Sequence, residues 1–456
     1  MSKTAPIKSA VYFLCSPSLG TLDNWLSVIW DLKKKREDLK VIIIFPRTNF
    51  IDQIHLSNIL LTLGAKTFDS IVFKSQGGHW LVSDTFSKAK TINKPTRFEW
   101  FLLRAISKLK KWYITEIVGS LIHNGYSRFN KHLNKKHLYN WHVAEKHAAC
   151  LLFDLYEESK SYNLELMKNF TAVPKFSIQH GININDGGVV DNTKKVLDGT
   201  SRKDVKAYLF SSMEKPIYEY KYAIHKSFME VVGVPRHAPD WMEIIRLNVL
   251  NNNNEINELG RDFIFIISRP GSTKYFSYER KKKALEDIKR LAWEDLKKNI
   301  VVKLHPKEKR EGVYEEVFGA ETYGDKWVYS GLHPFVLGKE SDFAISFYSG
   351  VVIDMLALGV PTIEYLDLRG IPEFDNDKSL RDKMGDPVFS YRYLDLVLGA
   401  SDYFQMKAHV MEIMNDRKTV LSRLQSKYNG LFPKIENIND KIAQDILDVS
   451  VEKCTE

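Results

Sequence analysis

Cysteine is scarce in this chain, and its scarcity excludes two kinds of structure. The three cysteines, Cys15, Cys150 and Cys454, lie far apart and form no CxxC or Cys/His pair of the kind that binds zinc. An odd number of scattered cysteines is also untypical of a secreted scaffold built on disulfides. We therefore expect reduced thiols and a cytoplasmic protein.

Long hydrophobic runs are also missing. No stretch reaches the roughly 18 apolar residues that cross a bilayer, and the N-terminal apolar run is only as long as a strand, too short for a signal peptide. Residues 97–122 predict a helix with aromatic residues on one side and basic residues on the other. This helix is either an interfacial helix on anionic lipid or a domain helix with a solvated basic face, so peripheral attachment to the inner face of the cell membrane stays open.

The charge of the chain is unbalanced, with 66 Lys and Arg against 57 Asp and Glu and a net charge of +9. Such an excess fits an anionic ligand, an anionic membrane surface or nucleic acid. The basic residues are spread over many predicted helices and no nucleic-acid recognition motif occurs. Nucleic acid is therefore the least favoured of the three partners.

Buried strands that alternate with helices make up most of the 456 residues, which is too long a chain for one ordinary core. This pattern predicts an α/β protein with parallel, doubly wound sheets in two Rossmann-like halves. The asparagine run at 251–254 predicts the hinge. The predicted domains are 1–245, with a basic helical insertion at about 97–146, then 258–430, and a C-terminal helix and tail at 431–456. The predicted strands are 9–16, 40–46, 70–75, 150–155, 175–180 and 207–212 in the first half and 262–270, 299–306, 327–330 and 342–347 in the second, and the main predicted helices are 22–36, 278–296 and 401–427.

Two strand ends of the first half carry candidate functional residues, because open α/β sheets bind ligands beyond the carboxyl ends of their strands. His180 follows a buried strand and precedes Gly181, and an imidazole with an ordinary pKa near 6.5 suits a general base. The alternative is a structural histidine that ties the turn to a backbone carbonyl. Arg236, in the sequence GVPR, can pair with a phosphate or carboxylate of a ligand or with a surface acid of the protein.

The second half has two further strand ends that suit an anion. His305 ends a buried strand, Pro306 fixes the turn after it, and Lys307 adds positive potential. Farther on, a strand turns into a helix, and the N–H groups there favour an anion, with a simple helix cap as the alternative. The residues of this turn are Ser346, Ser349 and Gly350, and Glu364 ends the next strand, from which it can reach a ribose.

The order of these motifs resembles a known group of proteins. The order is HG (His180-Gly181), GxPR (Gly233 to Arg236), HP (His305-Pro306) and the serine turn with its helix (Ser346 to Pro361). It resembles bacterial envelope-polysaccharide glycosyltransferases of GT-B fold, which include CDP-glycerol glycerophosphotransferases, capsule polysialyltransferases and Kdo transferases. Residues 1–150, where such enzymes bind differing acceptors, carry no matching motif.

The resemblance implies a GT-B fold, two Rossmann-like domains that face a cleft, with the first domain for the acceptor and the second for the nucleotide donor. It implies that His305 and the two serines hold the donor phosphate and that His180, with help from Asp186, acts as the base. Relatives often have adjacent serines where this chain has Ser349-Gly350, so a hydroxyl is lost and a backbone N–H remains.

The resemblance also implies the substrates. Many members use cytidine-nucleotide donors, and we expect transfer of an acidic ulosonic sugar (Kdo, sialic acid or a related nonulosonate) from a CMP-linked donor to a capsule or lipopolysaccharide glycan. The alternatives are a CDP-glycerol or CDP-ribitol polyol-phosphate transferase, a nucleotide-sugar 2-epimerase, and a basic membrane-bound scaffold without activity.

Metal binding is not expected. The one DxD match, Asp375 to Asp377, follows no clear strand and predicts a loop. We therefore expect no essential divalent metal and no cofactor beyond the donor nucleotide.

Overall fold

The computed structural model describes residues 10–452 except 16–18, 48–56, 76–77, 94–126, 129–130, 133, 143–146, 159, 182–201, 251–259, 261, 307 and 309–311. Several predictions lie outside the described residues. They are Asp186, Lys307, the asparagine run at 251–254 and most of the basic insertion predicted at 97–146.

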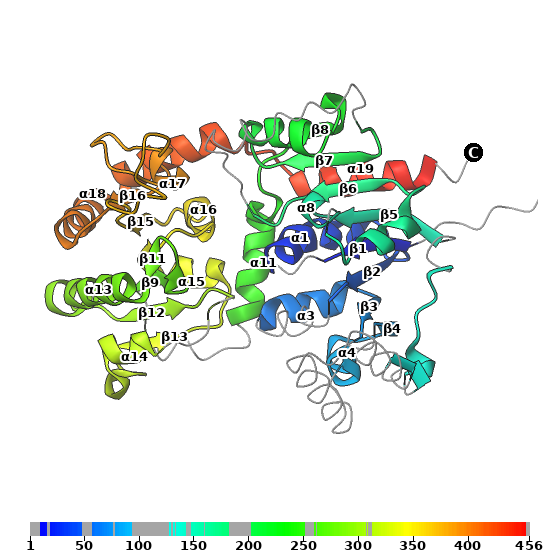
Figure 1. Ribbon diagram of the computed structural model, residues 1–456, viewed down its shortest axis with the longest axis horizontal. Coiled ribbons are helices and arrows are strands. Elements are labelled where there is room, and N and C mark those ends of the chain that lie inside the picture. Colours follow the sequence, from blue (N-terminus) through cyan, green and yellow to red (C-terminus); the bar gives the residue numbers. More distant parts are fainter. Residues whose placement is uncertain are drawn as a thin grey trace, which may run out of the picture. The chain divides into compact units, whose positions relative to one another are not determined.

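The chain forms two compact units and two large sheets, in which most neighbouring strands are parallel (Figure 1). Unit 1 consists of residues 1–180, 202–208 and 437–456, and unit 2 of residues 181–201 and 209–436. The C-terminal helix α19 (Ile438–Glu452) therefore packs with the N-terminal part of the chain. Among the helices in the described ranges, none is both long and apolar enough to cross a bilayer.

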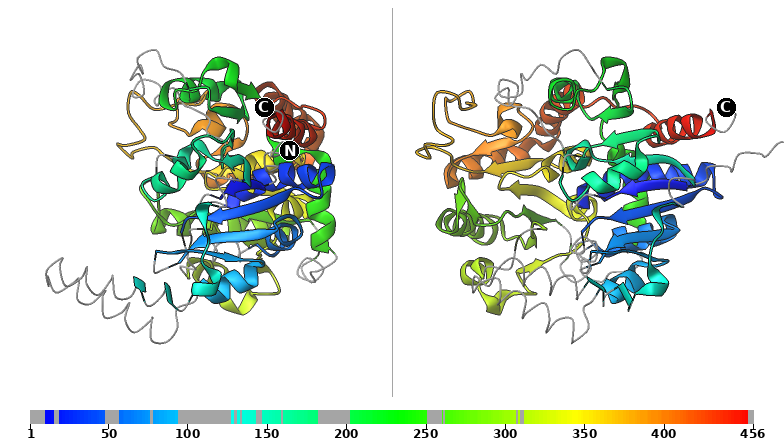
Figure 2. Two further views of the ribbon diagram at one scale, coloured as in Figure 1. Left: turned by 90° about the vertical axis from the view of Figure 1, so that its right-hand side faces the viewer. Right: turned by 45° about the vertical axis from the view of Figure 1, so that its right-hand side comes forward.

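The first sheet has eight strands in the order β4-β3-β2-β1-β5-β6-β7-β8 (Figure 1; Figure 2). All the pairs from β3 to β7 are parallel, and β4 pairs antiparallel with β3. The chain passes from the centre outwards on one side and then returns to the centre for the other side, which is the doubly wound pattern. The strands are β1 (Ala10–Leu14), β2 (Lys40–Phe45), β3 (Ser70–Lys74), β4 (Trp80–Ser83), β5 (Ala148–Phe153), β6 (Lys175–Ile178), β7 (Val205–Leu209) and β8 (Met229–Val231).

Helix α1 (Leu19–Lys35) packs into the core beside the first sheet. Residues 21–29 are all buried, among them Leu22, Trp25, Leu26 and Ile29, so the first turns of this helix are enclosed on every side. The indole Nε1 of Trp25 donates to the carbonyl of Phe153 at 3.2 Å, which fixes the helix at the carboxyl end of β5. The other helices of this unit are α3 (Asn58–Thr67), α4 (Phe86–Asn93), α8 (Leu155–Glu158) and α9 (Leu164–Met167).

The second sheet has six parallel strands in the order β13-β12-β9-β14-β15-β16. Numbered along the unit, this is the order 3-2-1-4-5-6 of a Rossmann sheet, whose direction of winding reverses between β9 and β14. Ligands of such sheets bind beyond the carboxyl ends of the strands at this reversal. The strands are β9 (Phe263–Ile267), β12 (Ile300–Lys303), β13 (Trp327–Tyr329), β14 (Ser341–Ser346), β15 (Thr362–Tyr365) and β16 (Leu398–Ala400).

The helices of unit 2 cover this sheet and continue beyond it. The long helix α18 (Tyr403–Leu431) contacts β15, β16 and α16, and it is kinked at Asp416, whose φ of −147° is not helical. A short hairpin of β10 (Ser272–Thr273) and β11 (Phe276–Ser277) follows β9. The other helices are α11 (Pro239–Leu250), α13 (Tyr278–Lys289), α14 (Val313–Phe318), α15 (Pro334–Glu340), α16 (Val351–Ala357) and α17 (Ser390–Tyr393).

Candidate functional site

Three strand ends of unit 2 meet at the reversal point of its sheet. Arg269 follows β9, His305 follows β12 and Tyr348 follows β14. The guanidinium of Arg269 connects the other two, because its Nε donates to the carbonyl oxygen of Tyr348 at 2.6 Å and its NH1 lies 3.3 Å from Nε2 of His305. The predicted histidine and the predicted serine turn are therefore joined, and a residue that the sequence analysis passed over joins them.

The contact between Arg269 and His305 fixes which group donates. A guanidinium carries only N–H donors, so Nε2 of His305 accepts and the imidazole in this arrangement is neutral with its proton on Nδ1. The permanent positive charge at this point therefore belongs to Arg269. Its planar fork has further N–H donors, and such forks match phosphate and carboxylate oxygens in pairs.

The turn from β14 into α16 is bent by an unusual backbone. Tyr348 has a φ of +70°, a region that bulky residues rarely occupy, and strain of this kind is concentrated at functional sites. The hydroxyl of Ser349 accepts from the N–H of Val351 at 3.4 Å, but the cap position of α16 is held by Gly350 without a side-chain cap, so Ser349 is not the N-cap residue of this helix. Because α16 spans only Val351–Ala357, its dipole is a weak source of charge beside the Arg269 guanidinium.

Ser346 and Glu364 lie side by side at the ends of β14 and β15, where they are partners in the parallel register. Both side chains are buried, and neither Oγ of Ser346 nor Oε2 of Glu364 has a hydrogen-bond partner in the described part of the chain. Burial raises the pKa of Glu364 to about 8, against a smaller opposing effect of the Arg392 charge. Glu364 is therefore mostly protonated at neutral pH and can donate a hydrogen bond.

Aromatic rings surround the turn. The ring of Tyr348 lies 4.2 Å from that of Phe389, 5.4 Å from that of Tyr391 and 6.1 Å from that of Tyr275, measured between centroids. Phe374 extends the cluster through Phe389 at 5.5 Å. Such a cluster holds the strained turn rigid and gives one side of the strand ends an apolar wall.

A buried polar network supports the loop that carries His305. The side chain of Glu308 is 1% exposed; its Oε2 accepts from the backbone N–H of His305 at 3.1 Å and its Oε1 from Nζ of Lys281 at 2.5 Å. The hydroxyl of Ser268 also donates to Oε1, at 2.8 Å, and contacts the hydroxyl of Tyr314. Glu308 thus ties the HP turn to α13 and to the end of β9, while Pro306 stays exposed.

Arg236 is engaged within unit 2. Its NH2 group lies 2.9 Å from Oδ1 of Asp354 on α16, and Nε2 of the neighbouring His237 lies 2.7 Å from the same oxygen. The GVPR turn also needs its glycine, because Gly233 has a φ of +77° and a Cβ there would lie 2.2 Å from the carbonyl oxygen of Pro433. Whether Arg236 also reaches a ligand stays a prediction.

A second candidate site lies in unit 1 at the ends of β5 and β6. Nδ1 of His180 lies 2.5 Å from Oδ2 of Asp154, and the same oxygen accepts from the backbone N–H of His180 at 3.0 Å. The carboxylate holds the proton on Nδ1 and makes Nε2 the basic nitrogen, as in an Asp–His pair of a hydrolase. The imidazole is about one-third exposed, while Asp154 is buried.

The surroundings of this pair are also buried and polar. The side-chain amide of Asn24 on α1 donates to the carbonyl of Gln179 at 2.8 Å, which fixes the chain just before His180. Burial raises the pKa of Glu157, which accepts from the hydroxyl of Tyr162 at 2.7 Å. The sequence analysis missed Asp154, although an acid at the end of the apolar run CLLF was a readable signal.

The loop predicted for the DxD match is confirmed. Residues 366–389 contain no helix or strand, and Asp375 accepts from the backbone N–H of Gly370 at 3.0 Å and pairs with Arg381 at 2.9 Å. Among the residues that the structure describes, no group of three or more His, Cys, Asp or Glu side chains is placed to hold a metal ion.

Solved structures resemble the whole chain, although neither a protein-family model nor a curated protein sequence matches it. The S. aureus protein MnaA in complex with UDP aligns with a TM-score of 0.52 at 10% identity over 98% of both chains. The UDP-GlcNAc 2-epimerase of Neisseria meningitidis bound to UDP-GlcNAc aligns with 0.51 at 12% identity over 97% of this chain and 99% of that one. A variant of the wall teichoic acid polymerase TagF soaked with CDPG aligns with 0.50 at 12% identity over 99% and 91%.

At such low identity these likenesses show the fold alone. The protein has the α/β GT-B fold with two Rossmann-like units, as the sequence predicts.

Proposed function

We propose that this protein is a glycosyltransferase that transfers an acidic ulosonic sugar, such as Kdo, sialic acid or a related nonulosonate, from a CMP-activated donor to a capsule or lipopolysaccharide glycan. The observation that supports it most is the Arg269 guanidinium, held at the reversal point of the second sheet by Tyr348 and His305. A fixed cation at this edge of a Rossmann sheet suits a nucleotide phosphate.

The donor is bound by the strand ends of unit 2. In this proposal the phosphate of CMP accepts from Arg269 and from the turn at Ser349 and Gly350, and His305 orients the guanidinium. The protonated Glu364, with a pKa of about 8, donates to a ribose hydroxyl, and the buried Ser346 beside it supplies a second polar contact. The negative charge that develops on departing CMP is stabilised by Arg269, and one such preorganised donor contributes about 3 to 4 kcal/mol.

The acceptor is activated by unit 1. Nε2 of His180 takes the proton of an acceptor hydroxyl, and Asp154 stabilises the resulting imidazolium. The hydroxyl oxygen forms a bond to the anomeric carbon of the donor sugar while the bond from that carbon to the CMP phosphate oxygen breaks. The electron pair leaves with CMP, and the proton stays on His180 until solvent removes it.

A polyol-phosphate transferase that uses CDP-glycerol or CDP-ribitol is the second candidate. Arg269 favours it as well, because a permanent charge beside His305 also suits a diphosphate. The two reactions differ in the bond that is formed: a glycosidic bond from a CMP-sugar and a phosphodiester from a CDP-polyol. The masses of the products separate them.

The test begins with a thermal-shift titration of CMP, CDP, UDP and GDP against the full chain. At 100 times its dissociation constant a nucleotide stabilises the protein by about 2.7 kcal/mol. We expect the cytidine nucleotides to give the largest shift and Arg269→Met to abolish it. Arg269→Lys keeps a charge but loses the fork and is expected to restore only part of the shift.

The control is Arg246→Met, which removes an arginine that pairs with Glu243 on the surface of the same unit. Incubation with CMP-Kdo, CMP-sialic acid and CDP-glycerol, each with an acceptor glycan, then identifies the reaction by product mass. Full cytidine-nucleotide binding by Arg269→Met and by His305→Ala would contradict the donor site. Turnover of a nucleotide sugar without any acceptor would favour an epimerase instead.

A further inference from the structure

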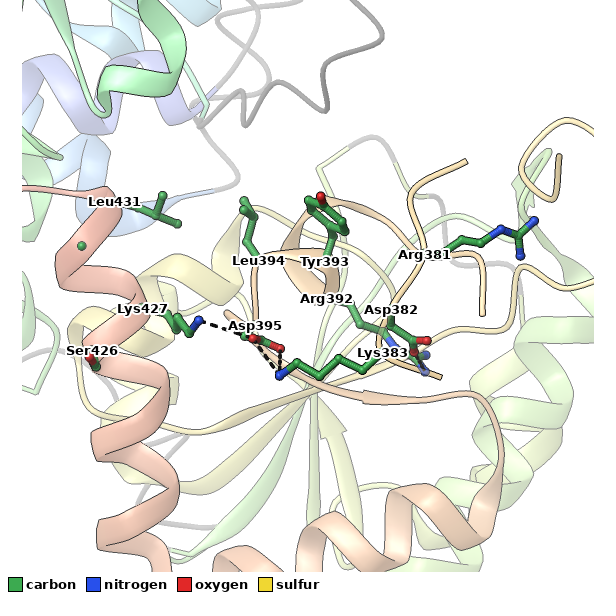
Figure 3. Close-up of a pocket in the computed structure, with 11 residues that line it drawn as sticks. Arg381, Asp382, Lys383, Arg392, Tyr393, Leu394, Asp395, Ser426, Lys427 and Leu431 are labelled. Atoms are coloured by element: carbon green, nitrogen blue, oxygen red, sulfur yellow. Dashed lines mark hydrogen bonds and ion pairs between the residues drawn. The ribbon is translucent and has the colours of Figure 1, made fainter. Parts of the chain in front are cut away.

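A cavity of about 580 Å³ opens in unit 2 beside α17, and Arg392 and Tyr393 of this helix line it. Its volume lies within the range of small-molecule sites, roughly 300 to 1,000 Å³. One side of the cavity is formed by residues 381–383 and by residues 392–395, which include the end of α17. The other side is formed by residues at the end of α18, between 426 and 431 (Figure 3). The site proposed above uses none of the residues that open into this cavity.

The cavity carries excess positive charge. The ammonium groups of Lys383 and Lys427 lie 3.1 Å and 3.6 Å from the same carboxylate oxygen of Asp395, so two cations share one anion (Figure 3). Both lysines are more than half exposed, and exposed pairs of this kind contribute only about 0 to 1 kcal/mol. A ligand anion can therefore take the place of Asp395 at either ammonium at little cost.

The wall beside these charges is rigid and permanently cationic. Arg392 is 7% exposed and is held by Oδ2 of Asp382 at 2.6 Å and by the hydroxyl of Ser401 at 3.0 Å. It lies so close over Gly399 that a Cβ at that glycine would be 2.0 Å from the guanidinium Nε. No larger residue fits beneath Arg392, and the cavity wall therefore keeps its shape.

The rim is apolar. Tyr393 is 51% exposed and Leu394 is half-buried, and Figure 3 shows both side chains on the opposite side of the cavity from the lysine pair. A ligand that fits needs an anionic group for the lysines and an apolar surface for the ring. A sugar unit with a carboxylate or phosphate has both, because the C–H faces of a pyranose are apolar.

The cavity and the proposed donor site share α17. Tyr391 of this helix packs against Tyr348, with its hydroxyl 3.4 Å from where a Cβ on Gly350 would lie, whereas Arg392 and Tyr393 line the cavity. Neighbouring residues of this one helical turn thus reach both sites, so a glycan chain bound in the cavity lies close to the proposed donor site.

We propose that this cavity binds an acidic unit of a glycan chain, next to the unit that reacts, with the Lys383–Asp395–Lys427 cluster as its anion-binding group. This proposal rests on the proposed function, because it assigns a glycan substrate to the same enzyme. The anion is a carboxylate in a polymer of acidic sugars or a phosphodiester in a polyol-phosphate polymer. The lysine pair suits the anion of either polymer.

The test uses isothermal titration of the full chain with three probes at low salt. The probes are a tetramer of galacturonic acid, the same tetramer with its carboxyls methyl-esterified, and a glycerol-phosphate tetramer. We expect one of the two anionic tetramers to bind, and its identity shows whether the cavity takes a carboxylate or a phosphate. The esterified tetramer should bind at least about tenfold more weakly than the galacturonic acid tetramer. The double variant Lys383→Ala/Lys427→Ala is expected to weaken the anionic probe by a similar factor.

Two controls keep this result separate from the proposed function. Lys226→Ala removes a lysine of matched exposure that pairs with Glu219 outside the cavity, and it should leave probe binding unchanged. The thermal shift with cytidine nucleotides should also be unchanged in the Lys383→Ala/Lys427→Ala variant. If the esterified tetramer binds as well as the acidic one, or if the double variant binds the anionic probe undiminished, the cavity proposal is overturned and nucleotide binding is not affected. If the unmodified protein does not bind cytidine nucleotides, the proposed function is overturned instead.

Discussion

At the scale of single residues, the pair of Asp154 and His180 determines the chemistry that unit 1 can perform. Asp154 is buried, and its Oδ2 accepts from both the ring and the backbone of His180. A histidine on an exposed strand end samples several rotamers and both tautomers, whereas this contact selects one. In our proposal, the general base His180 is thus oriented by Asp154, which does not itself contact the substrate.

We predict that Asp154→Asn lowers the transfer rate by about 100-fold or more, because an amide does not stabilise the imidazolium and can select the wrong tautomer. The measurement is the rate of product formation at saturating donor. KM for the donor should stay constant, since the donor binds to unit 2 in our proposal. The matched control is Asp84→Asn, which removes an exposed carboxylate that pairs with Lys88. An unchanged rate in Asp154→Asn would exclude His180 as the base.

Glu364 leads to a prediction about pH and stability. Its pKa is about 8 in the folded protein and 4.5 as the ordinary value, so the folded state holds this proton more tightly. The free energy of unfolding therefore falls as pH rises from about 4.5 to 8, by about 1.4 kcal/mol per pH unit at most, and the contribution is constant outside this window.

Glu364→Gln should remove this pH dependence. The free energy of unfolding of Glu364→Gln minus that of the unmodified protein should therefore be larger above pH 8 than at pH 4. Urea denaturation of both proteins between pH 4 and pH 9 measures it. Glu373→Gln, a change at an exposed carboxylate, is the control. Parallel stability curves for Glu364→Gln and the unmodified protein would show that Glu364 is already ionised in the folded state at neutral pH.

At the scale of secondary-structure elements, the loop after β12 depends on α13. Lys281 is fully buried and its Nζ contacts Oε1 of Glu308, whose other oxygen accepts from the backbone of His305. A helix on the surface of the sheet thereby positions a strand-end turn. The sequence offers no sign of this role, because Lys281 stands in the run of basic residues at 280–283 and nothing in the run distinguishes it from its neighbours.

We predict that Lys281→Met destabilises the protein by about 3 to 5 kcal/mol, because it leaves the carboxylate of Glu308 buried without its counter-charge. The double variant Lys281→Met/Glu308→Leu should recover most of this loss, since it removes both charges. Urea denaturation gives the energies. Lys282→Met, the next residue on the same helix, breaks only a half-exposed pair with Glu316 and should cost at most about 1 kcal/mol.

The same pair of variants separates stability from function. Only the double variant lacks Glu308, whose Oε2 accepts from the backbone N–H of His305. The double variant should therefore bind cytidine nucleotides more weakly than Lys282→Met does, even where its stability is recovered. Stability restored together with full nucleotide affinity would mean that Glu308 supports the fold only.

At the scale of the whole molecule, the two Rossmann-like units carry different groups at their strand ends, an Asp–His pair in one and a guanidinium in the other. In unit 2 the cation at the reversal point is a side chain of the protein. In our proposal, the charge that neutralises the donor phosphate is thus supplied by the chain itself.

We therefore predict that transfer proceeds without an added divalent metal. After dialysis against EDTA the rate should equal that of the untreated enzyme, and added Mg²⁺ or Mn²⁺ should not raise it. Arg269→Met is the comparison variant, because it lacks the charge that a metal could replace. Added Mg²⁺ should partly restore the transfer rate of Arg269→Met and leave the rate of the unmodified enzyme unchanged. A rate that collapses in EDTA and returns with metal would contradict the prediction.

The sequence by itself determined the class of fold and the places where function could lie. Alternation of apolar runs and helical periods is a local property, so strands such as β9 and β14 and the turns after them were predictable from composition and order. Antiparallel β4, helix α11 and the short β16 were not predicted, because their sequences are short or weakly patterned and tertiary packing selects their conformation.

Only the tertiary structure decided which side chains act together. Asp154 follows β5 and His180 follows β6, and these two strands neighbour each other in the sheet; Arg269, His305 and Tyr348 come together because β9 lies between β12 and β14. A hydrogen bond needs contact within about 3 Å, and separation along the chain carries no information about such contact until strand order and register are known. The sequence thus contained every residue of the proposed sites, while the topology of the two sheets assigned their partners.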